Sequence, residues 1–73
     1  MMKEKEFGKV IELLVGAYGS KMEMTEDRAS AYYLFLKKYP AHDVWDACYN
    51  WIKNNRFAPA ISDLVAILEE RYE

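Results

Sequence analysis

Histidine and cysteine are the side chains best able to bind metals or act as nucleophiles near neutral pH, and this chain has one of each, His42 and Cys48. A zinc site needs several such ligands that converge on one point. The spacing of six residues in a helical pattern places these two side chains on different helix faces. Cys48 falls among apolar residues, which indicates a buried structural thiol. His42 falls in a first helical turn, where we expect a solvated side chain. We predict no metal site.

Two pairs of adjacent carboxylates could supply acid and base groups, Glu26-Asp27 and Glu69-Glu70. Catalytic carboxylates need desolvation or a like-charge neighbour in a cleft, because their pKa values must separate. The first pair falls at a predicted helix N-terminus and the second on an outer helix face, where carboxylates are solvated. The tripeptide Gly8-Lys9-Val10 lacks the upstream glycine and the strand of a phosphate-binding loop. The sequence therefore predicts a protein that is not an enzyme and needs no cofactor.

The composition restricts the class of protein further. A chain of 73 residues, 52% of them apolar, predicts one domain whose apolar side chains are needed for packing. The net charge of −2 argues against a general nucleic-acid binder, because such proteins present a basic face. The single cysteine excludes an internal disulfide and fits a reducing compartment. No apolar run approaches the length of about 18 residues that suggests a membrane span, and the N-terminus lacks the apolar stretch of a signal peptide. We expect a soluble, intracellular domain.

The elements that position these residues follow from the spacing of apolar side chains. Apolar residues recur at helical spacing in four stretches, and no stretch reads as a credible strand. We therefore predict an all-α fold, a compact single domain formed by the whole chain, 1–73. Its four short helices are expected at about 4–18, 26–39, 41–54 and 61–72. The short connections between successive helices favour antiparallel or steeply crossed neighbours.

Helix stops and caps set the expected boundaries. Gly19 ends the first helix, Thr25 caps the second, and Pro40 suits the first turn of the third. Pro40 also pushes Tyr39 out of helical geometry. The predicted buried face of the fourth helix consists of Ile61, Leu64, Val65, Leu68 and Tyr72.

Some large or charged side chains fall outside or at the edge of the predicted buried faces and are candidates for binding a partner protein. These candidates are Leu34, Trp45, Tyr49, Arg56 and Phe57. Aromatic residues and arginine are the typical anchors of protein interfaces. For each apolar candidate, a place in the core or at its rim is the simpler interpretation, because a small domain uses edge aromatics to widen its core. Phe57 in particular could be a hydrophobic plug under the connection between the third and fourth helices.

The last two helices could also be compared with a helix-turn-helix. That DNA-binding motif uses a turn of about three or four residues and places polar, often basic, residues at the start of its second helix. Here the connection from Asn54 to Ala60 is longer, and the fourth helix opens with Ile61-Ser62-Asp63. Lys53 and Arg56 are isolated positive charges. Direct binding of nucleic acid is therefore the weaker hypothesis, that of a small helical DNA-binding domain.

Two short motifs carry a family resemblance, Tyr39-Pro40-x-x-x-Val44 and Ile52-x-x-Asn55-Arg56-Phe57-x-Pro59-x-Ile61-x-Asp63. With the apolar first helix that ends in a tyrosine, they resemble the N-terminal domain of phage replicative-helicase loader and inhibitor proteins. The resemblance covers about Phe7 to Leu68.

The resemblance implies a small all-helical module, made by a bacteriophage, that acts in the cytoplasm of the bacterial host when replication begins. Proteins of that family deliver a hexameric replicative helicase to an initiator on DNA and restrain the helicase until release. They are not enzymes and bind no small-molecule substrate or cofactor. The implied partners are replication proteins: the replicative helicase, a helicase loader or the phage initiator. An inhibitor of the host helicase loader is a further alternative.

One position departs from the family pattern. The family usually has threonine where this chain has Ala60, and that threonine begins a capping box with an acidic residue three positions later. Asp63 occupies the acidic position, but Ala60 has no side-chain acceptor. Either the cap is lost, at a cost of about 1 kcal/mol, or Ser62 has taken over with a shifted helix start.

Overall fold

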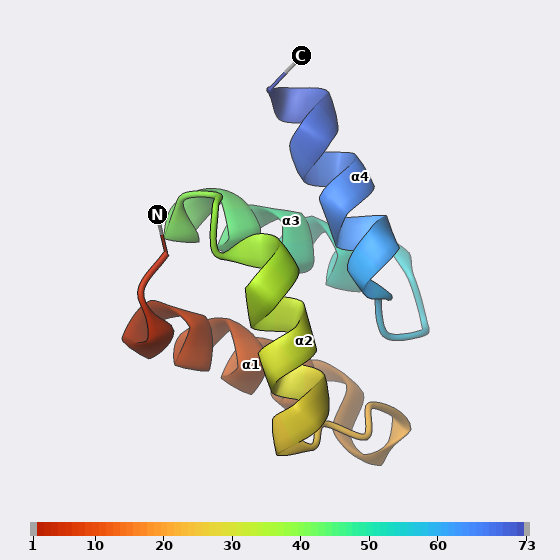
Figure 1. Ribbon diagram of the computed structural model, residues 1–73. Helices are drawn as coiled ribbons and strands as arrows, with labels where there is room; N and C mark the ends of the chain where they lie inside the picture. Colours follow the sequence, from red (N-terminus) through yellow and green to blue (C-terminus); the bar gives the residue numbers. More distant parts are fainter. Residues whose placement is uncertain (1, 73) are drawn as a thin grey trace.

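The computed structural model describes residues 2–72, and all regular structure in that range is helical (Figure 1). The all-α prediction is confirmed. The helices are α1 (Glu4–Tyr18), α2 (Glu26–Leu36), α3 (Ala41–Asn54) and α4 (Ile61–Arg71), with a single 3₁₀ turn, η1 (Gly19–Lys21), after α1.

The bounds of α1 and α3 are those expected, whereas α2 ends at Leu36 rather than near Tyr39. The reason is local. Lys37 still donates its backbone N–H to Tyr33, but Tyr39 donates to Leu36, three residues back, which is a tight turn and not a continued helix. Pro40 follows with extended geometry, and its ring disfavours helical geometry at the residue before it.

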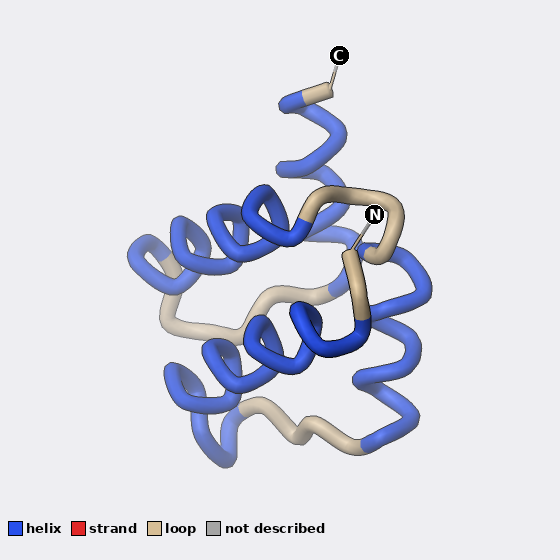
Figure 2. Tube along the Cα trace, turned by 90° about the vertical axis from the view of Figure 1, so that its left-hand side faces the viewer, coloured by secondary structure: helices blue, strands red, loops and turns tan. Residues whose placement is uncertain are grey.

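The helices form two pairs that cross each other. α1 and α3 lie side by side and run in the same direction, while α2 and α4 cross them steeply (Figures 1 and 2). Successive helices are therefore crossed neighbours, which is one of the two arrangements expected from short connections. α3 packs against both α1 and α4, so it holds the central position in the fold.

Every helix supplies fully buried apolar side chains to one core. The largest of them are Leu14, Leu36, Leu64, Leu68, Val10 and Val44. Cys48 is also fully buried on α3, as predicted. Segments outside the helices contribute too, because Met2, Met22 and Pro59 are buried. In a chain this short, such contributions enlarge a core that four short helices alone would leave small.

Side-chain hydrogen bonds attach three helices to the connection between α3 and α4. The Tyr18 hydroxyl of α1 donates to the Asn55 carbonyl at 3.2 Å, and the Tyr32 hydroxyl of α2 donates to the Pro59 carbonyl at 2.7 Å. The indole N–H of Trp51 on α3 donates to the Phe57 carbonyl at 2.8 Å. A connection that runs against other elements must satisfy its backbone carbonyls in this way, because water does not reach them freely. This segment is therefore fixed in place by three helices.

The N-terminus of α4 keeps half of a capping box. The Ala60 backbone N–H donates to Asp63 Oδ2 at 2.9 Å, but the Ala60 side chain has no oxygen to accept a hydrogen bond in return. The helix start is not shifted to Ser62, since α4 begins at Ile61 and Ala60 is its N-cap. By comparison, the side chain of Thr25 does cap α2, with its Oγ1 accepting from Arg28 N at 3.2 Å.

We expect Ala60→Thr to raise the free energy of unfolding by about 1 kcal/mol, because the extended backbone of Ala60 already has N-cap geometry and lacks only the acceptor. Urea denaturation monitored by circular dichroism measures the change. Ser62→Ala is the control and should change stability by less than about 0.5 kcal/mol. A large loss from Ser62→Ala would mean that Ser62 is the cap.

A second test concerns the glycines of the first helix. A Cβ atom added at Gly8 or Gly16 would meet no other atom within 4 Å, so each Gly→Ala change should stabilise α1 by roughly 0.5–1 kcal/mol. Gly19 has φ 57°, a left-handed conformation, so Gly19→Ala should cost roughly 1 kcal/mol or more. Urea unfolding of the three variants tests both statements. The account of α1 is wrong if all three shift stability in the same direction.

Candidate interaction surface

The exposed side of α3 carries a row of large side chains that we call the α3 stripe: Trp45, Tyr49 and Ile52 on the helix, and Arg56 directly after it. The spacing i, i+4 and i+7 places the first three on one side of the helix. Trp45 is 40% exposed and Tyr49 is 52% exposed, while Ile52 is half-buried and Arg56 is exposed. Exposed aromatic rings in a row are unusual on a domain this small, so this side of α3 is the leading candidate for a contact surface.

The α3 stripe runs along the line where α3 meets α1. Lys9 and Val10 of α1 line a shallow hollow together with Trp45 near the start of α3. Ala17 of α1 lines a second hollow with Ile52 and Arg56 at the other end of α3. We call this line between the two hollows the α1–α3 seam. It exists because α1 and α3 run in the same direction, so that residues early in one helix meet residues early in the other.

Three of the five candidate contact residues belong to the α3 stripe, Trp45, Tyr49 and Arg56. Lys53 adds a charge beside them, with its ammonium nitrogen 5.6 Å from the centre of the Tyr49 ring. That distance allows a cation–π interaction, which is weak at an exposed site. The surface therefore combines aromatic area with positive charge.

Leu34 lies elsewhere. It is on α2 and 61% exposed, and it is not among the residues that line either hollow of the α1–α3 seam. Its neighbour Phe35 is 53% exposed and was not among the sequence candidates. The signal for Phe35 was present in the sequence, because it falls off the face defined by Tyr32 and Leu36.

The prediction that Phe57 is a plug under the connection is wrong. Its side chain is 66% exposed, the most exposed of the large apolar residues in the part of the chain described. The position is fixed from the other side: Trp51 packs edge-on against the Phe57 ring, with ring centres 6.1 Å apart, and binds its carbonyl. The backbone carbonyl of Phe57, and not its side chain, anchors the connection.

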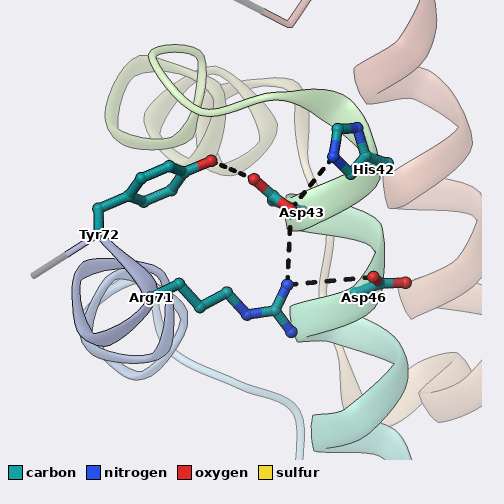
Figure 3. Close-up of polar contacts among 5 residues, drawn as sticks. All are labelled: His42, Asp43, Asp46, Arg71 and Tyr72. Carbon is teal, nitrogen blue, oxygen red and sulfur yellow. Dashed lines mark hydrogen bonds and ion pairs between the residues drawn. The ribbon is translucent and has the colours of Figure 1, made fainter.

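The prediction that Tyr72 is buried is also wrong. α4 ends at Arg71, and Tyr72 is 54% exposed. Its ring stacks on Tyr39 with centres 5.8 Å apart, and its hydroxyl donates a hydrogen bond to Asp43 at the start of α3 (Figure 3). That hydrogen bond raises the pKa of Tyr72, because the phenolate would lose its donor proton and face a carboxylate.

Asp43 is the centre of a small polar cluster that joins the end of α4 to the start of α3 (Figure 3). Arg71 Nη1 lies 3.6 Å from Asp43 and 4.0 Å from Asp46, and His42 Nε2 lies 3.3 Å from Asp43. The His42 side chain is 80% exposed, as expected for a solvated residue. Exposed ion pairs contribute little stability, so we interpret the cluster as a fastening for the end of α4.

The groups considered for chemistry are separated in the structure. Burial raises the pKa of the Cys48 thiol to about 12. The carboxylates at positions 26, 27, 69 and 70 are exposed. Within residues 2–72, no three His, Cys, Asp or Glu side chains form a group that could hold a metal ion. No helix in that range is both long enough and apolar enough to cross a membrane.

The comparison with protein families decides the family. The family model for the N-terminal domain of a phage helicase loader and inhibitor matches residues 2–65. The chain belongs to this family. The resemblance seen in the two sequence motifs is therefore confirmed. The match includes α1, α2, α3, the connection and the first turn of α4, and so the whole α3 stripe of this loader-family domain. Comparisons with curated proteins and with solved structures gave no significant match.

The raised pKa of Cys48 gives a direct test of whether this thiol is reactive. At pH 8 a thiol with a pKa of about 12 has roughly a 1,000-fold smaller thiolate fraction than one with a pKa of 9.0, and the thiolate is the nucleophile. We expect a disulfide reagent such as dithionitrobenzoate to label the folded domain at least about 100-fold more slowly than the urea-unfolded chain. Stoichiometric labelling at equal rates in both states would contradict the burial of Cys48.

Proposed function

We propose that this domain is a protein-interaction module of phage DNA replication, related to phage helicase loaders and inhibitors, and that it acts by binding and not by catalysis. The observation that carries the proposal is the family match over residues 2–65. Its partner would be a replication protein, and the cytoplasm of the bacterial host would be the place of action. The domain would need no cofactor or small-molecule substrate.

The α3 stripe supports this proposal through its residue types. Tryptophan, tyrosine and arginine are over-represented among the residues that dominate binding energy in protein interfaces. Trp45 and Tyr49 retain large exposed areas in a domain where Tyr18 and Tyr32 are buried and donate hydrogen bonds to the backbone. We propose the α3 stripe as the contact surface for the partner.

Three replication proteins are candidate partners: the replicative helicase, the helicase loader of the host and the phage initiator. Binding to the helicase would make the domain a loader or a restraint on unwinding. Binding to the host loader would make it an inhibitor of host replication. The family favours the helicase or the initiator, and the α3 stripe itself is compatible with each.

A small DNA-binding domain is the second hypothesis, and the geometry of α3 and α4 does not favour it. Residues 55–60 separate the two helices and are fixed by hydrogen bonds, so α4 is not placed as the second helix of a short helix-turn-helix. Glu69 and Glu70 are exposed on α4, where they would repel phosphates.

The proposal is tested by measuring binding of the purified domain to each of the three proteins by isothermal titration calorimetry. At least one should bind, and the double change Trp45→Ala/Tyr49→Ala should weaken that binding at least about tenfold, since interface anchors of this type contribute about 1–2 kcal/mol or more. Leu34→Ala is the matched control, an exposed apolar residue on α2 whose removal should leave affinity unchanged. Absence of binding to all three proteins would refute the proposed function.

A further inference from the structure

We propose that the α1–α3 seam accepts an acidic amphipathic helix from the partner, one whose apolar side chains are flanked by aspartate or glutamate. This inference rests on the proposed function, because it specifies the chemistry of the partner at the same surface. Three features of the seam carry it: its unpaired positive charges, its length and the state of its aromatic rings.

The positive charges along the seam lack carboxylate partners among the described residues. Lys9 belongs to one hollow, Lys21 and Arg56 belong to the other, and Lys53 lies over Tyr49 between them. The ion pairs within residues 2–72 use Arg71 and His42, and none uses these four side chains. The domain as a whole has a net charge of −2, so this gathering of four positive charges is local.

A carboxylate at the seam is already engaged. Of the described residues that line the two hollows, Glu6 is the one acidic residue, and its Oε1 accepts the backbone N–H of Lys3 at 2.9 Å. The second hollow has no acidic residue among its described lining residues, while Lys21 and Arg56 both border it. A partner that brings carboxylates to this end of the seam would therefore meet unpaired positive charge, and complementary charge favours both the encounter and the choice of partner.

The length of the seam fits a short helix. From Trp45 to Asn54, the last residue of α3, the helix rises about 14 Å at 1.5 Å per residue, and Arg56 follows directly. A partner helix of two to three turns spans that distance and would place apolar side chains over Trp45, Tyr49 and Ile52. Amphipathic helices bind apolar grooves in this way, with anchors at i, i+3, i+4 and i+7.

Single-stranded nucleic acid is the other polymer with negative charge, and the aromatic rings argue against it. Proteins that bind single strands stack bases on free aromatic faces. The Lys53 ammonium lies over one face of Tyr49, so that face is not free for a base. Trp45 is 40% exposed, and a surface of four positive charges is small for tracking a phosphate backbone.

The test uses two designed peptides of about 14 residues, close to four helical turns, with the same leucine positions, one flanked by glutamate and the other by lysine. Titration of each into the ¹⁵N-labelled domain is followed by the amide signals. The acidic peptide should shift signals from residues 9–17 and 45–56, and the basic peptide should not bind. Equal binding of both peptides, shifts confined to α2 and α4, or displacement of the acidic peptide by oligo(dT) would overturn the proposal.

Charge variants make the test specific. Lys53→Glu/Arg56→Glu should weaken binding of the acidic peptide at least about tenfold, because two attractive contacts become repulsive. Arg28→Glu/Lys38→Glu is the matched control, with the same change in net charge on and just after α2, and should bind as the unchanged domain does. Equal weakening by both variants would show a general charge effect and would overturn the proposal.

The outcomes for this inference and for the proposed function can be separated. If the acidic peptide binds the seam but none of the three replication proteins binds, the proposed function fails while the chemistry of the seam stands. If a replication protein binds through Trp45 and Tyr49 with an affinity that Lys53→Glu/Arg56→Glu leaves unchanged, the inference fails alone.

Discussion

The fold depends on the hydrogen bonds that three helices donate to the connection between α3 and α4. Tyr18, Tyr32 and Trp51 each satisfy one carbonyl of residues 55–59. Since these donors come from α1, α2 and α3, the connection fixes the position of α4 relative to all three other helices. Each neutral hydrogen bond contributes only about 1 kcal/mol net, but an unpaired buried carbonyl costs more, so the three donors matter chiefly because their absence would be penalised.

This constraint also separates structure from function in the family motif. Asn55, Phe57 and Pro59 belong to the connection through their backbone carbonyls, and Pro59 is fully buried. Arg56 is exposed and borders the second hollow of the α1–α3 seam. The hydrogen bond from Tyr18 to Asn55 also fixes the end of α3 against α1, and so holds the α3 stripe beside the seam. Packing of the connection and exposure of the stripe are two consequences of one arrangement.

Local periodicity was enough to predict four helices, the start of each and the buried thiol Cys48. It also marked Trp45 and Tyr49 as edge residues of α3, because residues on one helix need no tertiary information to be aligned. The errors at Phe57 and Tyr72 have tertiary causes: the first is anchored by its backbone, and the second follows the end of α4 and meets Asp43, 29 residues away. The three donors to the connection and the pairing of α1 with α3 could not be predicted, because they depend on how separate elements pack.

The central claim is that the α1–α3 seam, and not the opposite pair of helices, is the face on which a replication partner binds. Hydrogen–deuterium exchange of the domain, alone and in complex with the replication protein that it binds, tests this most directly, because the partner slows exchange where it covers the surface. We predict slower exchange in peptides covering residues 9–17 and 45–56, with residues 26–36 and 61–71 unchanged. Protection confined to α2 and α4 would contradict the account.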